Sequence, residues 1–417
     1  MSIKKLVFVK GIIETLSHFS EELALFFQSQ GYEIFMFDDR ERQLAKTKLE
    51  RFIQKKQTAF ITFNFIGLSG EEIFKDSSTE SVWESMQIKV YNILVDHPLY
   101  YYKQFMKKNT DMYLFCLDKK HVSFVKRFFL DVKVAFMPMA GNQMISEWSS
   151  ISKSLSGNPF EMEKEAILGT QRQEMIPYSD RKYELVFAGN YANLKPLEEK
   201  CKTQSKEYID FYHEIIEMGK TDIDGSIETL LEKSLKKEMP DLKEQELVLG
   251  MSSVIFLDIY IRAYFRNQVI MALAKKEIPV FLIGKDWGNL ECKGKEYLSY
   301  SNGMLASEEC IQIIKNSKMS LNVMPGFKDG SHDRIYTSML QRSLVLTDKS
   351  EYLEETCKDF DTICYYDIKN LQSLPEKILQ LRKDETLAEK IADHGYHYAR
   401  YNHTWAERGK FLLKYFE

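Results

Sequence analysis

No stretch of the 417-residue sequence reaches the roughly 18 uninterrupted apolar residues that a membrane-spanning helix needs. The first apolar run, Leu6–Lys10, is too short for the apolar region of a secretion signal and is more typical of a buried strand. We therefore expect a cytoplasmic protein, and a peripheral membrane contact stays open.

Cysteine and histidine are too scattered to form a recognisable metal or redox site. The six cysteines include no CxxC pair, and the eight histidines include no HExxH motif. Cys116 and Cys364 lie in apolar, strand-like segments, which favours buried free thiols in a reducing compartment. Asp222 and Asp224 have the spacing of a DxD metal motif, but their charged helical surroundings favour a helix cap. We therefore expect no metal and no bound cofactor.

Neither sign of charge is in excess. The 57 Lys and Arg residues are nearly balanced by 61 Asp and Glu residues, so the formal net charge is −4. This balance gives no electrostatic reason to expect nucleic acid as a partner, because nucleic acids are bound by basic surfaces. A hydrophobic fraction of 44% is typical of a globular protein, and the length suits two α/β domains.

Residues 1–150 alternate short apolar runs with amphipathic stretches. The predicted strands are Leu6–Lys10, Glu33–Asp38, Ala59–Asn64, Val90–Asp96, Met112–Asp118 and Val132–Pro138. The predicted helices are Ile13–Gln30, Arg40–Lys55 and His121–Leu130. The strands are apolar continuously rather than alternately, which indicates a parallel sheet covered by helices on both faces. We expect a Rossmann-like first domain.

Residues 151–180 are polar and irregular, and we assign them to an inter-domain linker. A second α/β domain is predicted over residues 181–395, and its residues 194–276 are charged, helical and poor in glycine, which indicates a helical insertion. The predicted strands of this domain are Glu184–Tyr191, Pro279–Gly284, Met319–Met324, Leu344–Thr347 and Thr362–Asp367. Its predicted helices after the insertion include Ser307–Asn316 and His332–Arg342, and helices continue to the end of the sequence.

The segment Ser320–Asp348 is the most informative part of the sequence. It predicts a strand, a loop containing Gly326 and Gly330, a helix and a second strand. Ser331 is well placed to cap the helix, so that the first turn presents free N–H groups and the positive end of the helix dipole. A pyrophosphate is the usual occupant of such a position at the carboxyl end of parallel strands.

His332 and Arg334 lie in the first turn of that helix and can add charge-assisted hydrogen bonds to phosphate oxygens. Residue types alone leave open an ordinary helix start with a surface arginine. Arg262 and Arg266, one turn apart on a predicted helix, either add positive charge near a phosphate or pair with surface acids.

Several motifs together resemble the glycosyltransferase group 1 C-terminal domain of spore-maturation CgeB-like proteins, over roughly residues 183–408. They are Val186–Asn190, Leu321–Asn322, Gly330, Asp333–Tyr336, Val345–Asp348 and His403–Trp405 with Arg408. Val90–Tyr101 resembles the N-terminal domain that often precedes it. The resemblance implies the GT-B arrangement of two Rossmann-like domains, in which the C-terminal helix, residues 396–417, packs back on the first domain.

The resemblance also implies a nucleotide sugar as donor substrate. The residues expected to hold this donor are Gly189, Asn190, Lys285, Asn322, His332, Asp333, Arg334 and Thr337. Two positions depart from the family pattern. Thr337 stands where relatives commonly carry a glutamate that holds the ribose, and Arg342 stands where they commonly carry glycine. Because a hydroxyl replaces a bidentate carboxylate, the sequence favours a nucleotide sugar without naming the sugar.

Asp96 and His97 follow a predicted buried strand and would face the crevice where doubly wound folds bind ligands. Either side chain could deprotonate an acceptor hydroxyl, since imidazole titrates near neutrality. The alternative is that Asp96 caps a turn and His97 is a loop residue. Glu14 and His18, after the first strand, are weaker candidates. Trp287, near Lys285, either stacks on a nucleotide base or caps the sheet.

We therefore expect a glycosyltransferase that moves a sugar from a nucleotide diphosphate to a hydroxyl of a glycan or protein acceptor, without a catalytic metal. Two alternatives stay open. The first is a catalytically inactive GT-B-like scaffold that binds or chaperones another glycosyltransferase. The second is a sugar-nucleotide epimerase of the same fold.

Overall fold

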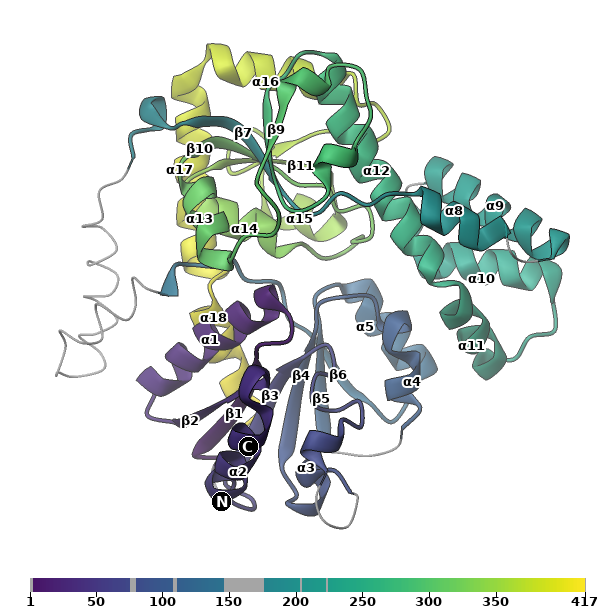
Figure 1. Cartoon of the computed structure of the whole chain (residues 1–417), viewed down its shortest axis with the longest axis vertical. Helices are drawn as coiled ribbons and strands as arrows, with labels where there is room; N and C mark the ends of the chain where they lie inside the picture. Colours follow the sequence, from purple (N-terminus) through teal and green to yellow (C-terminus); the bar gives the residue numbers. More distant parts are fainter. Residues whose placement is uncertain are drawn as a thin grey trace.

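The computed structural model describes residues 3–75, 80–107, 111–145, 176–202, 205–222 and 224–416. Two parallel six-stranded sheets dominate it, one in each half of the chain (Figure 1). The predicted α/β class with two Rossmann-like domains is confirmed. The predicted linker, residues 151–180, lies mostly outside the described residues.

The first sheet has the strand order β2-β1-β3-β4-β5-β6. Its strands are β1 (Lys5–Lys10), β2 (Glu33–Asp38), β3 (Thr58–Phe63), β4 (Lys89–Leu94), β5 (Met112–Cys116) and β6 (Lys133–Phe136). Its helices are α1 (Glu14–Ser29), α2 (Arg42–Phe52), α3 (Val82–Ser85), α4 (Tyr102–Phe105) and α5 (Lys119–Phe128). Every residue of β3 is buried, as expected for a strand covered by helices on both faces.

The second sheet has the order β12-β11-β10-β7-β8-β9. Its strands are β7 (Tyr183–Ala188), β8 (Val280–Ile283), β9 (Leu298–Tyr300), β10 (Ser317–Leu321), β11 (Leu344–Thr347) and β12 (Cys364–Tyr365). Its helices are α12 (Phe256–Lys275), α13 (Ser307–Lys315), α14 (Asp333–Leu340), α15 (Glu351–Thr356), α16 (Ser373–Lys383) and α17 (Glu385–Asn402). The short edge strand β9 was not predicted, because two of its three residues are exposed.

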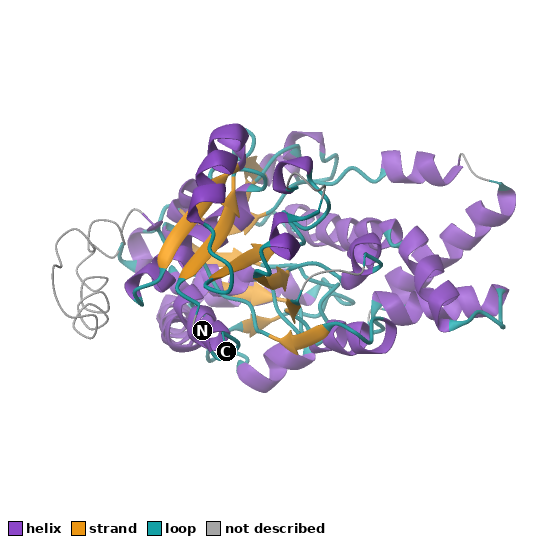
Figure 2. Cartoon of the chain, turned by 90° about the horizontal axis from the view of Figure 1, so that it is seen from below, coloured by secondary structure: helices purple, strands orange, loops and turns teal. Residues whose placement is uncertain are grey.

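The helical insertion contains α8 (Lys195–Lys202), α9 (Lys206–Thr221), α10 (Ile227–Glu238) and α11 (Glu244–Val254). It projects sideways from the second sheet and lies against the first domain (Figure 1 and Figure 2). One hydrophobic cluster joins residues of β4, β5 and α5 to residues of α9, α10 and α11. The insertion therefore belongs to the second domain by sequence and shares a core with the first.

The last helix, α18 (Trp405–Leu413), packs on α1 of the first domain. The ring of Trp405 lies 4.8 Å from that of Phe19, and Phe416 stacks on Phe27 at 5.4 Å. This packing ties the end of the chain to the domain in which it begins.

Among the described residues, no single helix has the length and apolar character needed to cross a membrane. The pair α11 and α12 meets both criteria only when taken together, and the two helices are bent by 46°.

Candidate functional site

Two loops meet at the carboxyl ends of β7 and β8. Gly284 has φ +141°, and a Cβ at this residue would lie 2.5 Å from the carbonyl oxygen of Gly189, so only glycine permits this approach. The Asn190 side chain accepts the backbone N–H of Lys285 at 3.1 Å. Gly189, Asn190 and Lys285 therefore form one structural unit.

Lys285 contributes its backbone to this unit, and the residue itself is exposed. Trp287 is 2% exposed and donates its indole N–H to the carbonyl of Gly189 at 2.7 Å. Of the two predicted roles of this tryptophan, the structure shows the one in which it caps the end of the sheet.

Arg334 extends from the first turn of α14 to the ends of the neighbouring strands. Its Nε donates to Asn322 Oδ1 at 3.0 Å, and its Nη1 donates to the carbonyl of Ala188 at 3.0 Å. Asn322 is held in turn, because its Nδ2 donates to the hydroxyl of Thr347 at 2.9 Å. Burial lowers the pKa of Arg334, since the charged form loses hydration that neutral oxygens replace only in part.

The cap of α14 differs from the predicted one. The N-cap residue is His332, whose Nδ1 accepts the backbone N–H of Arg334, and not Ser331. Ser331 is buried and its hydroxyl bonds that of Tyr336 at 2.9 Å. Burial and the nearby Arg334 lower the pKa of His332, which favours the neutral ring that a capping acceptor requires. Asp333 follows in the first turn and contacts the ring of His332.

A second arginine approaches the same place from α12. Arg266 Nη1 donates to the carbonyl of Asn190 at 2.9 Å, and the guanidiniums of Arg266 and Arg334 lie 5.9 Å and 5.4 Å from the ring of Phe187. Burial, then Arg334 and Arg262, lower the pKa of Arg266. Among the described residues, neither Arg266 nor Arg334 forms an ion pair with a carboxylate.

Arg262, one turn before Arg266, is paired. Its Nε lies 2.9 Å from Asp258 Oδ2, and its Nη2 donates to the hydroxyl of Tyr100 at 3.1 Å. The Tyr100 hydroxyl donates to the same carboxylate at 2.7 Å. The first domain therefore reaches the arginines of α12 through Tyr100, which was not predicted as a site residue although it lies in the motif Val90–Tyr101.

Thr337 is not brought to the arginines. Its hydroxyl accepts the backbone N–H of Asn142 at 2.9 Å, and the side chain is buried against the segment that leaves the first domain. Arg342 has φ +55°, a left-handed conformation that explains why a glycine would suit this position. It forms an ion pair with Asp393 and lies over the ring of Tyr396.

Asp96 and His97 lie between β4 and the short helix Pro98–Tyr101. Asp96 Oδ2 accepts hydrogen bonds from Asn64 Nδ2 at 2.9 Å and from the hydroxyl of Tyr101 at 3.2 Å. His97 Nδ1 accepts the backbone N–H of Leu99, and its Nε2 lies 3.1 Å from Glu228 Oε2. Both ring nitrogens of His97 are therefore engaged.

Glu228 belongs to α10 of the insertion, and its role was not predicted. Burial alone would raise the pKa of Glu228, but the hydrogen bond with His97 and the charges of His97 and His121 lower it to about 2.

The weaker candidates Glu14 and His18 form hydrogen bonds with the backbone of distant segments. Glu14 accepts the backbone N–H of Ser307 at 3.0 Å, and His18 Nε2 lies 2.9 Å from the carbonyl of Gln143.

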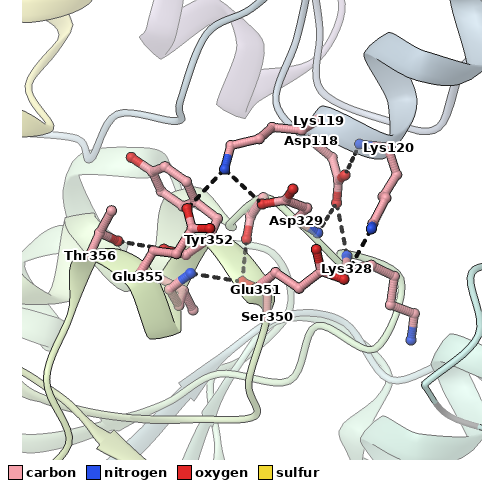
Figure 3. A network of polar contacts seen from close by, with 12 residues as sticks. Asp118, Lys119, Lys120, Lys328, Asp329, Ser350, Glu351, Tyr352, Glu355 and Thr356 are labelled. Carbon is pink, nitrogen blue, oxygen red and sulfur yellow. Dashed lines mark hydrogen bonds and ion pairs between the residues drawn. The ribbon is translucent and has the colours of Figure 1, made fainter.

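A polar network joins the end of β5 and the start of α5 in the first domain to the loop before α14 and to α15 in the second (Figure 3). Asp118 Oδ2 accepts the backbone N–H groups of Lys328 and Asp329, at 2.8 and 2.9 Å, and its Oδ1 caps α5 through Lys120. Lys119 adds ion pairs with Asp329 and Glu355, at 3.2 and 2.9 Å. Sequence reasoning missed this network, although an aspartate before a helix start is a capping signal.

Part of the second domain matches a known protein family, and the whole chain resembles solved structures. Residues 266–414 match a family model described as glycosyl transferase-like. The chain is similar to the structure of sucrose-phosphate synthase from Thermosynechococcus elongatus, with a TM-score of 0.51 and 9% identity over 99% of this chain and 98% of that one. The same values hold for Anabaena HepE in complex with UDP-glucose. No curated protein sequence matches the chain significantly.

The structural similarity extends over both domains and shows the GT-B fold. Together with the family match over most of the second domain, it supports a glycosyltransferase. Membership of the CgeB-like group stays a prediction. The match begins within α12, so most of the helical insertion, residues 194–276, lies outside it.

Proposed function

We propose that this glycosyltransferase takes its sugar from a nucleotide-diphosphate donor and transfers it to a hydroxyl group of a glycan or protein. The observation that supports this proposal is the pair Arg266 and Arg334, two half-buried cations that form no ion pair with a described carboxylate. A diphosphate placed beside both guanidiniums would supply such an anionic partner.

The same two arginines have a role in the reaction. The acceptor oxygen forms a bond to the anomeric carbon of the sugar while the bond from that carbon to the diphosphate breaks. The bonding electrons leave with the nucleoside diphosphate, and fixed cations stabilise the charge that develops on it. Arg334 and Arg266, with the N–H groups at the start of α14, would thus replace a catalytic metal ion.

The acceptor proton needs a destination if the reaction inverts configuration at the anomeric carbon. Asp96 and His97 remain our candidates for the base that accepts this proton. They differ in the hydrogen bonds that each would have to break first. Asp96 keeps one carboxylate oxygen outside the hydrogen bonds from Asn64 and Tyr101. His97 would first have to release Glu228 or Leu99. A reaction that retains configuration needs neither base, because an oxygen of the departing diphosphate can take the acceptor proton on the same face of the sugar.

Other proposed donor contacts come from Gly189, Asn190, Lys285, Asn322, His332 and Asp333. Thr337 would contribute only through its position in α14, because its hydroxyl faces Asn142. No observation on the described residues favours the inactive scaffold or the epimerase.

The test is a thermal-shift and hydrolysis screen against a panel of nucleotide sugars that begins with UDP-glucose. The screen is repeated on Arg334→Ala, with Arg51→Ala as the matched control because Arg51 is exposed on α2. We expect the best donor to raise the melting temperature of the wild type and of the control. The Arg334→Ala variant should lose most of that shift, and an unchanged shift would contradict the assigned phosphate site.

A further inference from the structure

A cavity of about 370 Å³ lies where the helical insertion faces the first domain. Its walls come from α5, from α10 with the turn before it, and from two residues of the second domain, Lys328 and Glu351. The volume falls in the range of about 300–1,000 Å³ that small-molecule sites occupy. The cavity is separate from the arginines that we assign to the donor.

The cations that line this cavity, Lys120, Arg127 and Lys328, are outnumbered by its carboxylates, which are Asp224, Glu228, Glu232 and Glu351. Lys120 Nζ lies 3.0 Å from Glu351 Oε1, and Arg127 binds Glu232 at 2.7 Å. Glu228 is bound by His97. Because cations and carboxylates compensate locally, the cavity offers no surplus positive charge for a phosphate or sulfate, unlike Arg266 and Arg334.

The remaining lining combines a small apolar part with several hydroxyl groups. Phe124 and Phe128 of α5 are each 4% exposed, so they close the base of the cavity with small apolar areas and offer no open ring face. Ser123, Ser226 and Thr229 supply hydroxyls that donate or accept hydrogen bonds. A neutral ligand with many hydroxyls fits this mixture better than an apolar or an ionic one.

The cavity shares part of its wall with a smaller cavity that reaches α12. Gly225, Ser226 and Lys328 line both this cavity and a smaller one, which is bounded by Asp258, Arg262 and Gly326. Arg262 is one helical turn from Arg266. The smaller cavity thus lies between the larger one and the helix that carries Arg266.

We propose that this cavity binds the acceptor, that the acceptor is a neutral carbohydrate, and that Glu228 accepts a hydrogen bond from one of its hydroxyls. This inference rests on the proposed transferase function. It assigns acceptor selection to the helical insertion, since α10 forms one wall of the cavity and carries Glu228. His97 then acts as a positioning residue, which holds the Glu228 carboxylate toward the cavity.

The experiment is saturation-transfer NMR with methyl glycosides of glucose, galactose, mannose and N-acetylglucosamine, together with maltose, lactose and glucose 6-phosphate. Spectra are recorded with and without UDP. Two variants probe the cavity. Ser123→Leu fills it from the exposed surface of α5, and Glu228→Gln removes the charge while it leaves an oxygen for His97.

Ser253→Leu is the matched control, because Ser253 is exposed on α11 and bonds the carbonyl four residues before it, as Ser123 does. We expect at least one neutral saccharide to bind the wild type and the control, and both cavity variants to weaken its binding at least fivefold. A nucleotide-sugar thermal shift should persist in all four proteins.

The inference is overturned if no neutral saccharide binds, if the cavity variants bind as the wild type does, or if glucose 6-phosphate binds better than the neutral sugars. These results differ from a failure of the proposed function. Failure of the proposed function would appear as the absence of any nucleotide-sugar shift in the wild type.

Discussion

The carboxylate of Asp118 lies 2.8 Å from the backbone nitrogen of Lys328, so a residue of the first domain fixes the loop that leads to the arginine site of the second. The same loop is held from within its own domain, because buried Asp348 accepts the backbone N–H of Met324 at 2.8 Å. Burial raises the pKa of Asp348 to about 6. The start of α14 is thus positioned by carboxylates of both domains.

Asp118→Asn should weaken donor binding while the protein stays folded. The amide keeps one oxygen to cap α5, but its NH₂ group would face the N–H groups of Lys328 and Asp329, which then lose their acceptor. A buried N–H group without an acceptor costs about 1–3 kcal/mol. If that cost falls on the site that binds the nucleotide sugar, affinity for the nucleotide sugar should fall roughly 5- to 100-fold. Calorimetric titration with the best donor measures the change. Asp111→Asn, on the exposed surface, is the control, and equal affinities in both variants would contradict the prediction.

Gly284→Ala should disrupt the Gly189–Asn190 loop. The added methyl group would lie 2.5 Å from a backbone oxygen that cannot move without displacing β7. We expect a loss of at least about 2 kcal/mol of stability and of most donor binding. Gly303→Ala is the control, since Gly303 also has a positive φ but has no atom within 4 Å of an added Cβ. Urea unfolding of both variants checks this, and similar losses in the two would refute the contact argument.

Arg266→Met should have opposite effects on stability and on donor binding. Methionine has a side chain of similar apolar length, and the change removes a half-buried cation that has no carboxylate partner among the described residues. We expect unchanged or greater stability of the free protein, with donor affinity reduced at least about tenfold. Arg262→Met is the comparison, because Arg262 is paired with Asp258 and its loss leaves that acid uncompensated. A variant of Arg266 that binds the donor normally would remove this arginine from the site.

The fold was predictable because its strands are apolar on both faces over four to six residues, a local signal that needs no distant partner. Most predicted strands, such as Glu33–Asp38 and Leu344–Thr347, occur where expected. The strand β9 gives no such signal, since it is short and lies at an edge. The packing of the insertion on the first domain also could not be predicted, because periodicity identifies an apolar helix face and not what covers it.

The site was predictable only where one segment contains it. The strand–loop–helix segment 320–348 placed Asn322 and Arg334 together, and the structure joins them at 3.0 Å. The partner of His97, in contrast, is 131 residues away in the sequence. The cap of α14 is His332 and not Ser331, because the serine hydroxyl is bonded to Tyr336 of the same helix.

His403→Gln should flatten the dependence of stability on pH in the acid range. His403 is 1% exposed, stacks on Tyr336 at 3.7 Å and bonds the carbonyl of Met139. Burial and nearby Arg408 lower its pKa to about 3, whereas an unfolded histidine titrates near 6.5. Between these two pKa values the native state therefore binds fewer protons than the unfolded state. The stability that neutral His403 contributes is present above pH 6.5 and is lost as the pH falls toward 3.

As the pH falls from 7 to 4, the titration of His403 alone should lower the free energy of unfolding of the wild type by about 3 kcal/mol. The His403→Gln variant should not show this loss, because glutamine does not titrate. Urea unfolding at pH 7, 6, 5 and 4 measures the free energy of unfolding of the wild type and of His403→Gln. The titration of all other groups cancels when the two free energies are subtracted. We expect the wild type to be more stable than the variant at pH 7, and this difference in stability to shrink steadily below pH 6.5. His213→Gln, at an exposed position of α9, should stay parallel to the wild type. If the curve of His403→Gln is also parallel to that of the wild type, His403 does not stay neutral in the folded protein.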